Sequence, residues 1–341
     1  MSVLPDPYPA TSWAFPAHRG WSPPRGVCGG GIVVALGVLV FLVGGCSSGG
    51  GSSSTTAVPN AGATTSVTPA GAGATARAGT TGTSGTSGTG ERAGTLRILV
   101  SNDDGIGAPG IDALVVGLRA LPATEVVIAA PATNQSGVGE KRSATLPAAS
   151  PATTASGVAG TAVAGTPADA VTWALDGGMP TRPHVVVSGV NFGQNVGPSI
   201  AISGTVGAAR TAAKRGIPAV AVSQGLDQRL EDPLDYRVAV GRAIAWVEEH
   251  RAALLAQPAT QTDPADIDPA TVDNINVPTC RGAEPRGRKD VPVAADTTNG
   301  GLLDPAVCDT AVTSPVDDIQ ALNNGWITHT EVGAGPPAPA A

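Results

Sequence analysis

Aromatic residues and positive charge are both scarce in this chain of 341 residues. Only five Trp, three Phe and two Tyr are present, against 46 Gly and 30 Pro. This composition indicates less folded chain than the length alone suggests. Lys and Arg total 20 and Asp and Glu total 27, so the net charge is -7. That balance argues against a nucleic-acid backbone as the partner.

A hydrophobic run long enough to span a membrane comfortably is also lacking. The apolar run Ile32–Val43 follows Arg19 and Arg25 and has the length of a signal-peptide core. Small residues and Cys46 come directly after it, which resembles a bacterial lipoprotein signal whose cysteine is acylated. We therefore predict a signal peptide over residues 1–46 and an exported protein anchored to the cell membrane through Cys46. An uncleaved anchor is the alternative.

Residues 47–94 are almost wholly Ser, Gly, Thr, Ala and Pro, which predicts a disordered linker. The folded domain is expected over residues 95–332, and the Pro-rich and Ala-rich tail 333–341 is expected to be disordered. Two cysteines, Cys280 and Cys308, lie within this domain. In an extracytoplasmic protein they are expected to form a disulfide.

The stretch around which the domain is organised is Leu96–Leu114. A short apolar run of strand length is followed by a small polar loop that contains Asp103 and Asp104, and then by a segment with helical periodicity. Adjacent carboxylates repel each other, so a fold retains them near its core mainly where a cation binds. A solvated loop with a helix N-cap is the simpler interpretation.

Further strands and helices alternate along the domain, which predicts a Rossmann-like, doubly wound and mostly parallel α/β sheet. A β excursion is expected within Ala144–Val163, and an irregular segment with a return to strand near Trp326 is expected at the C-terminal end. The other expected strands are 125–130, 184–188, 217–222 and 273–278, and the expected helices are 111–118, 166–176, 203–216 and 235–256.

Oxygen-bearing side chains follow three of these strands. Asp103 and Asp104 follow the first strand, Ser136 follows the second, and Asn191 follows the 184–188 strand. Parallel strands end at a common edge, so these side chains are expected to converge there. Their oxygens suit a hard divalent cation, Mg²⁺, Mn²⁺ or Ca²⁺, better than zinc. A helix start at Ser203–Thr205 beside them would suit an anion, and the two together indicate phosphoryl chemistry.

Three other classes of protein lack support in the same stretch. A dinucleotide-binding fold would need G-x-G-x-x-G after the first strand, and NDDGIGAPG does not supply it. A phosphatase with an aspartyl nucleophile usually carries Asp-x-Asp at this place. A phospho-receiver domain would need a further Asp after its third strand, where this chain has Ser188 to Asn191.

The motifs ILVSNDDGIGAPGIDAL, NQSG, GTPAD, VVVSGVNFGQNVG and ISGTVGAA occur in this order. Together they resemble the SurE family of survival proteins, which are metal-dependent nucleotidases and acid phosphatases. The resemblance implies a SurE-like α/β core with a β-rich C-terminal excursion and one divalent cation, Mg²⁺ or Mn²⁺. It also implies release of phosphate from nucleoside monophosphates, and a homodimer or larger oligomer.

Matched motif by motif, the resemblance implies that Asp103, Asp104, Ser136 and Asn191 bind the metal. Asp103 and Asp104 are the candidate catalytic residues, and Asp103 is the candidate proton acceptor. The residues implied to contact phosphate are Asn102, Asn195, Ser203, Gly204 and Thr205.

The chain also departs from the family pattern. Ala132 and Thr211 stand where acids are usual, Gly139 where a second Ser is usual, and Ile202 where Tyr is frequent. These departures leave substrate preference open, and a non-catalytic surface lipoprotein that binds nucleotides or a protein partner is the alternative function. The closing helix of the family is lacking, which weakens the expectation of an oligomer. His184 and His329 are interpreted as structural.

Overall fold

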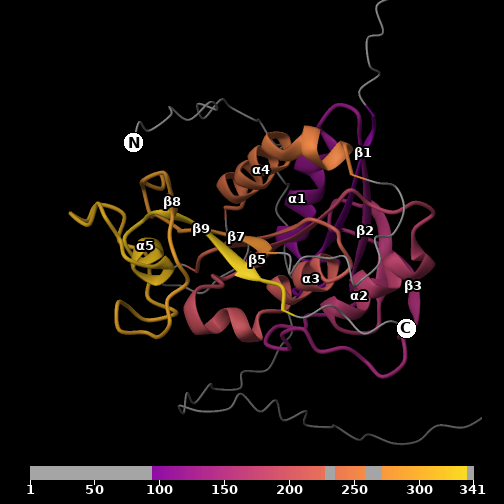
Figure 1. Ribbon diagram of the computed structural model, residues 1–341, viewed down its shortest axis with the longest axis horizontal. Coiled ribbons are helices and arrows are strands. Elements are labelled where there is room, and N and C mark those ends of the chain that lie inside the picture. The colour runs from indigo at the N-terminus through magenta and orange to yellow at the C-terminus, as the bar shows by residue number, and fades with distance from the viewer. Residues whose placement is uncertain (1–93, 227–234, 258–270, 336–341) are drawn as a thin grey trace, which may run out of the picture. The chain divides into compact units, whose positions relative to one another are not determined.

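The computed structural model describes residues 94–226, 235–257 and 271–335 (Figure 1). The predicted signal peptide with Cys46 lies outside the described residues. So do the predicted linker up to residue 93 and the tail from residue 336 onwards. In the described ranges no helix is both long and apolar enough to span a membrane.

Within the described ranges, nine strands form one sheet in the order β3-β4-β2-β1-β5-β6-β7-β9-β8. The central strands from β4 to β7 are all parallel, and the antiparallel pairs among these nine strands are β3–β4 and β7–β9. The prediction of a mostly parallel α/β sheet is therefore confirmed. The strands are β1 Leu96–Ser101, β2 Thr124–Pro131, β3 Ala149–Thr153, β4 Ala159–Val163, β5 Val185–Phe192, β6 Ala219–Gln224, β7 Thr271–Val277, β8 Arg288–Asp290 and β9 Ile327–Gly333.

Helices cover both faces of the sheet (Figure 1). Helices α1 (Pro109–Arg119) and α4 (Arg237–Leu255) pack on one face, and α2 (Pro167–Trp173) and α3 (Gly204–Ala213) pack on the other. A short helix α5 (Asp318–Asn323) lies with β8 and β9 at one end of the sheet. The result is three layers, with the sheet buried between two layers of helices.

The alternation of side chains along β1 explains this arrangement. Leu96, Ile98 and Val100 are buried in the cluster beneath α1 and α4, whereas Leu99 is buried in the cluster beneath α2 and α3. Successive strand residues point to opposite faces, so a run of apolar residues fills both cores at once. The chain then leaves the core at Asn102 and turns into the acidic loop.

Strand β5 is longer than predicted. It continues through Asn191 to Phe192, after an irregularity in its pairing between Ser188 and Asn191. Gly189 has φ +137°, and a Cβ on it would lie 2.2 Å from the carbonyl oxygen of Val222. Only glycine fits at position 189. The glycine-containing stretch that looks like a loop in the sequence is thus an irregular part of strand β5.

The two ends of the sheet hold the least regular elements. The expected β excursion is the hairpin of β3 and β4, whose second strand pairs with β2. The C-terminal segment that looked irregular in sequence contains β8 and α5. Cys280 and Cys308 form a disulfide across this segment, with Cα atoms 5.7 Å apart. The guanidinium of Arg286 and the ammonium of Lys289 both lie over the ring of Trp326.

Candidate functional site

Asp103 lies at the carboxyl end of β1, and its side chain is directed toward the start of α3. Its Oδ1 accepts a hydrogen bond of 2.6 Å from Oγ1 of Thr205. The side chain is almost fully buried. Burial raises the pKa of Asp103 above its ordinary value, although hydrogen bonds from Thr205 and Gly204 act to lower it. This carboxyl is thus fixed in orientation and costly to ionise without a cation.

Asp104 is held by different neighbours. The backbone N–H of Phe192 donates to its Oδ2 at 2.9 Å, and Nδ2 of Asn134 donates to its Oδ1 at 3.3 Å. These contacts come from β5 and from the loop after β2, which flank β1 in the sheet. Two neighbouring carboxylates are therefore kept close together by donors from three separate segments.

The loop after β2 is tied to both aspartates and carries Ser136. The N–H of Gln135 donates to the backbone carbonyl of Asp103 at 2.7 Å. Asn134 contacts Asp104 through Nδ2 and accepts the N–H of Ser136 through Oδ1 at 2.9 Å. The structure thus brings Ser136 to the sheet edge of the aspartates, as the parallel-strand argument predicts.

Asn191 reaches the same edge from β5, which is the neighbour of β1. Its side chain is buried, and Nδ2 donates to the carbonyl oxygen of Gly193 at 2.6 Å. This hydrogen bond fixes the amide orientation with Nδ2 toward the loop, and Oδ1 is the atom that remains for a cation. Asn191 lies on an irregular part of a strand, not in the loop where the sequence analysis put it.

These donors fit a hard divalent cation. They comprise two carboxylates, one hydroxyl and one amide oxygen, which are the ligand types that Mg²⁺ and Mn²⁺ take in proteins. Within residues 94–226, 235–257 and 271–335, no group of three or more His, Cys, Asp or Glu side chains could hold a metal. The candidate site in the described residues therefore combines the two carboxylates with the uncharged oxygens of Ser136 and Asn191.

The start of α3 is more complex than a free anion site. Oγ of Ser203 caps the helix by accepting the N–H of Val206 at 3.1 Å, which leaves its own O–H to donate. The N–H groups of Gly204 and Thr205 stabilise the carboxylate of Asp103. In this structure the anion that the helix N-terminus faces is thus Asp103 itself.

Gly204 is required by the close approach of α3 to Asp103. A Cβ at this position would lie 2.7 Å from Cβ and 2.8 Å from Oδ2 of Asp103. These distances are too short for a Cβ atom. The helix can therefore approach the carboxylate this closely only because residue 204 is glycine. Gly207, one turn later, allows the same close approach to the backbone of Gly139, where its Cβ would lie 2.4 Å from the carbonyl oxygen.

Asn195 connects this arrangement to β7. Its Nδ2 donates to Oγ of Ser223 at 3.0 Å and lies 3.4 Å from Oγ1 of Thr205. Two fully buried asparagines hold its backbone: Asn276 accepts its N–H at 2.7 Å, and Nδ2 of Asn274 donates to its C=O at 2.8 Å. The sequence analysis missed both, although their spacing of two on a strand puts them on one face.

Asn102 lies at the base of the acidic loop. Its side chain is fully buried, and Nδ2 donates to the carbonyl oxygen of Gly105 at 2.9 Å, which closes the turn that carries the aspartates. Its contact with phosphate stays a prediction. Its Oδ1 is buried and has no hydrogen-bond partner among the described residues.

The positions that depart from the family pattern surround the site. Ala132 lines a pocket beside Asp104, and Ile202 is 59% exposed just before Ser203. Gly139 has φ +61°, and its N–H donates to the carbonyl oxygen of Ile202. Thr211 is buried and bonds within its own helix, to the carbonyl of Gly207. The hydrogen bonds of Asp103, Asp104 and Asn191 described above involve none of these four side chains.

The pocket next to Asp104 has a volume of about 390 Å³. It lies between the acidic loop, the N-terminal end of α1, Phe192 of β5 and Tyr236, which precedes α4. The described residues that line it are Asp104, Gly105, Gly107, Ala108, Pro109, Ala132, Asn134, Phe192 and Tyr236.

The C-terminal excursion supports the loop that follows β5. The carboxylate of Asp318, fully buried in α5, accepts the N–H of Gly197 at 2.9 Å and the N–H of Ala294 at 2.8 Å. The side chain of Gln194 adds a further contact, because its Nε2 donates to the carbonyl oxygen of Leu302 at 2.6 Å. The loop that carries Asn195 is therefore fixed by residues more than 100 positions later in the chain.

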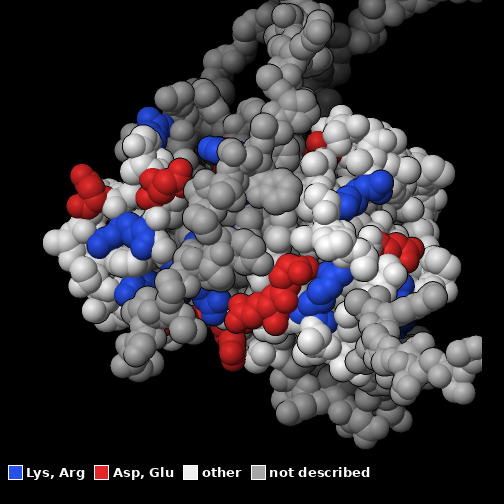
Figure 2. All heavy atoms as spheres, turned by 90° about the horizontal axis from the view of Figure 1, so that it is seen from above, with Lys and Arg blue, Asp and Glu red and all other residues white. Residues whose placement is uncertain are grey.

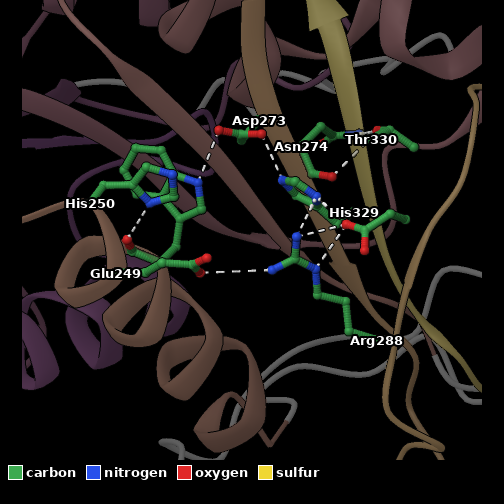
Figure 3. A network of polar contacts seen from close by, with 9 residues as sticks. Glu249, His250, Asp273, Asn274, Arg288, His329 and Thr330 are labelled. Atoms are coloured by element: carbon green, nitrogen blue, oxygen red, sulfur yellow. Dashed lines mark hydrogen bonds and ion pairs between the residues drawn. The ribbon is translucent and has the colours of Figure 1, made fainter. Parts of the chain in front are cut away.

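Neither His184 nor His329 belongs to the site. His184 bonds to the backbone and side chain of Arg97. His329 lies between Asp273 and Asp290, 2.6 Å and 2.7 Å from their carboxylates, with Arg288 nearby (Figure 3). Burial alone would lower the pKa of His329, but its hydrogen bonds to the two carboxylates raise it above the ordinary value. This network joins β7, β8 and β9.

Charges of both signs occur together on the surface. Figure 2 shows Asp and Glu side chains beside Lys and Arg on the face in view. Ion pairs such as Lys214–Glu140 and Arg251–Glu248 contribute to this mixing. The view shows no continuous basic surface among the coloured residues, and the expectation that the chain does not bind a nucleic-acid backbone stays a prediction.

Comparison with known proteins agrees with this geometry. The family model described as Survival protein SurE matches residues 98–298. A 5'-nucleotidase SurE from Methanopyrus kandleri is 47% identical over 129 residues, which cover 38% of this chain and 49% of that protein. A 5'-nucleotidase SurE from Nitratidesulfovibrio vulgaris is 35% identical over 250 residues, which cover 68% of this chain and 85% of that protein.

The chain thus spans about half the length of the first of these relatives and most of the second. Among solved structures, it is similar to the crystal structure of the SurE protein from Aquifex aeolicus. The TM-score is 0.53 and the identity 25%, with 70% of this chain and 93% of that chain covered.

Proposed function

The chain belongs to the SurE family, and from that premise we propose that it is a metal-dependent phosphomonoesterase. The proposed reaction converts a nucleoside monophosphate and water to a nucleoside and phosphate. Relatives named 5'-nucleotidase SurE support the substrate class. The observation that carries the proposal is the pair Asp103 and Asp104, held together at the sheet edge by donors from α3, β5 and the loop after β2.

Asp103, Asp104, Ser136 and Asn191 are the residues that would hold the cation. When bound there, Mg²⁺ or Mn²⁺ would supply Lewis acidity toward the phosphoryl oxygens. The protein supplies orientation: Thr205 fixes Asp103, Phe192 and Asn134 fix Asp104, and Gly193 fixes the amide of Asn191. Positioned ligands of this kind maintain a site with little rearrangement during the reaction.

The O–H of Ser203, at the start of α3, is the donor that these contacts leave for a phosphate. The amide of Asn195 is bonded to Ser223 and Thr205, so its proposed contact with phosphate would require it to exchange one of these partners. Asp103 is the proposed proton acceptor. The test of that role is the pH–rate profile of Asp103→Asn, and an unchanged rate and slope would contradict it. Oδ2 is the carboxylate oxygen proposed to accept the proton, because Oδ1 of Asp103 already accepts a hydrogen bond from Thr205.

The decisive experiment measures phosphate release from a panel of 5'- and 3'-nucleoside monophosphates by the full chain. Each reaction contains Mg²⁺, Mn²⁺ or EDTA. The variants are Asp103→Asn and Asp104→Asn, which preserve side-chain shape and remove charge. The matched control is Asp296→Asn, an exposed carboxylate in the C-terminal excursion. We expect turnover that needs metal, survives in the control and falls at least about a hundredfold in the two site variants.

Absence of turnover with either metal, from protein shown by circular dichroism to be folded, would contradict the proposal. Nucleotide binding by the same inactive protein would then favour the alternative, a binding protein on an enzyme scaffold. Metal-independent turnover would contradict the role of the four ligands.

We also propose that the protein is exported and anchored to the membrane by a lipid on Cys46. The charged start, the apolar run and Cys46 support this proposal, and the Cys280–Cys308 disulfide suits an oxidising compartment. Incorporation of a labelled fatty acid into the wild type but not into Cys46→Ala is the expected result. Labelling of both, or of neither, would contradict it.

A homodimer is a further proposal, supported by the family resemblance. Light scattering on the purified protein would test it, with a mass of twice 33.4 kDa expected for the unprocessed chain. A monomeric mass at micromolar concentration would contradict it.

A further inference from the structure

The pocket beside Asp104 is distinct from the start of α3, where the candidate phosphate donors lie. Asp103 is directed toward Thr205 and Gly204 of α3, whereas Asp104 lines the pocket near the N-terminal end of α1. A substrate that reaches from one place to the other would pass directly over the paired carboxylates. The rest of its structure would then enter the pocket.

Two aromatic rings give this pocket its chemistry. Phe192 follows the candidate ligand Asn191 directly, and Tyr236 lies against Gly110 at the start of α1. A Cβ on Gly110 would lie 3.3 Å from Cε1 of Tyr236, so this ring is in contact with the helix. The domain has few aromatics, and two of them line one small pocket. Aromatic faces are the surfaces on which nucleobases stack.

The charges and size of the pocket restrict its occupant further. The described lining residues include no Lys or Arg, and Asp104 is the one charged side chain among them. A second phosphate or a carboxylate would meet no cation among these described residues. The volume of about 390 Å³ falls within the range of small-molecule sites, roughly 300–1,000 Å³. An uncharged, flat group suits the lining best.

We propose that this pocket receives the nucleobase of the substrate and that Phe192 is the side chain on which the base stacks. The inference rests on the proposed function and deepens it, because it assigns the leaving-group end of the substrate to named residues. It also predicts a preference for nucleotides over smaller phosphate esters. Stacking is tolerant of base identity, so purine and pyrimidine nucleotides are both accepted.

The test compares two substrates that differ only in the base, 5'-AMP and ribose 5-phosphate. For the wild type, kcat/KM is expected to be at least about tenfold higher for 5'-AMP, the size of effect that one stacked base produces. Phe192→Ala should remove most of this ratio, mainly through KM for 5'-AMP. Phe192→Tyr, which retains the aromatic face, should restore it. Val316→Ala, which trims an exposed apolar side chain outside the pocket, should retain the wild-type ratio.

A second measurement does not depend on turnover. Calorimetric binding of adenosine to the full chain should weaken about tenfold in Phe192→Ala and be retained in Phe192→Tyr and Val316→Ala. Equal losses for 5'-AMP and ribose 5-phosphate in Phe192→Ala would overturn the inference, and so would a folded wild type that does not bind adenosine. If no phosphate is released but adenosine binds in a Phe192-dependent way, the proposed reaction fails and the base site stands.

Discussion

Oγ1 of Thr205, at the start of α3, donates a hydrogen bond of 2.6 Å to Oδ1 of Asp103, at the end of β1. The two residues are 102 positions apart in sequence, and both are buried. Asn195 in turn lies 3.4 Å from the same hydroxyl. Thr205 therefore links the acidic loop to the loop after β5. The sequence motifs imply a different role for Thr205, which is contact with phosphate.

Loss of this hydroxyl should weaken the site without unfolding the protein. Thr205→Val retains the shape of the side chain and removes the donor, so Asp103 loses its fixed orientation. Second-layer partners of metal ligands typically contribute 10–100-fold to affinity or activity. We expect a decrease in kcat/KM of about that size and a higher metal concentration for half-maximal activity, measured by metal titration of phosphate release.

Thr205→Ser serves as the control, because it retains the donor and removes only a methyl group. It should retain activity within about fivefold of the wild type. Equal activity of the valine variant and the wild type would show that Asp103 does not need this hydrogen bond.

Gly204 gives a steric test of the same contact. Gly204→Ala introduces a Cβ that would lie 2.7 Å from Cβ of Asp103, so either the helix or the carboxylate has to move. Overpacking of this kind costs about 1–3 kcal/mol of stability, and displacement of a positioned group by 1 Å can cost about a hundredfold in rate. Activity assays and thermal unfolding of the purified variant would measure both effects.

Gly241 provides the matched substitution. It lies on the exposed side of α4, and a Cβ there would meet no atom within 4 Å. Gly241→Ala should raise the free energy of unfolding by up to about 1 kcal/mol, because alanine favours helix more than glycine does. Loss of activity in this variant would indicate that α4 affects the site in a way not visible in its contacts.

His329 should make stability depend on pH. Its pKa is raised in the folded protein, so its contribution is complete below the ordinary pKa of about 6.5 and is lost as pH rises through the folded value. The pKa values of Asp273 and Asp290 are lowered, and their contributions are lost only as pH falls below about 4. Between pH 6 and 9 the histidine therefore dominates this network.

The measurement is the melting temperature of wild type and His329→Gln at pH 6 and at pH 9. We expect the glutamine variant to lose most stability at pH 6 and to show a smaller decrease toward pH 9. The contribution of His184 to stability changes with pH in the opposite direction. Burial and Arg97 lower its pKa, so its contribution increases as pH rises. A parallel pH dependence in both proteins would exclude a charged His329 from the network.

The disulfide should contribute to stability more than to catalysis. Cys280 and Cys308 are 28 residues apart, and closing a loop of that length stabilises the folded state by about 3.5 kcal/mol in the chain-entropy model. The double variant Cys280→Ser/Cys308→Ser should unfold at lower urea concentration and retain kcat at 20 °C. Loss of kcat in folded protein would indicate that the excursion shapes the site directly.

The core of the fold could be predicted because its signals are local. The apolar runs of β1 and β5 and the helix start at Ser203 follow from periodicity and from capping chemistry. The convergence of Asp103, Asp104, Ser136 and Asn191 also follows, since parallel strands bring their carboxyl ends to one edge. The sequence thus predicts those features that follow either from one segment alone or from the general geometry of parallel sheets.

The rest depends on contacts between distant segments. Asn274 and Asn276 look like ordinary strand residues until β7 is placed opposite the loop that carries Asn195. Helix α5 has six residues, too few to show a repeating apolar pattern, and it is stabilised by the Asp317 cap and by packing of Ile319 and Leu322. The burial of Asn102 follows from the tight turn at Gly105, which has φ +100°.

Asp318 carries a consequence for the order in which the protein becomes functional. Its carboxylate fixes Gly197, 121 residues earlier, in the loop that also carries Asn195. A chain synthesised only as far as β7 would already contain every candidate ligand, yet this loop would lack its anchor. Phosphatase activity should therefore arise late in biosynthesis, after α5 has packed against the loop. A nascent chain, or a chain cleaved before α5, would be inactive.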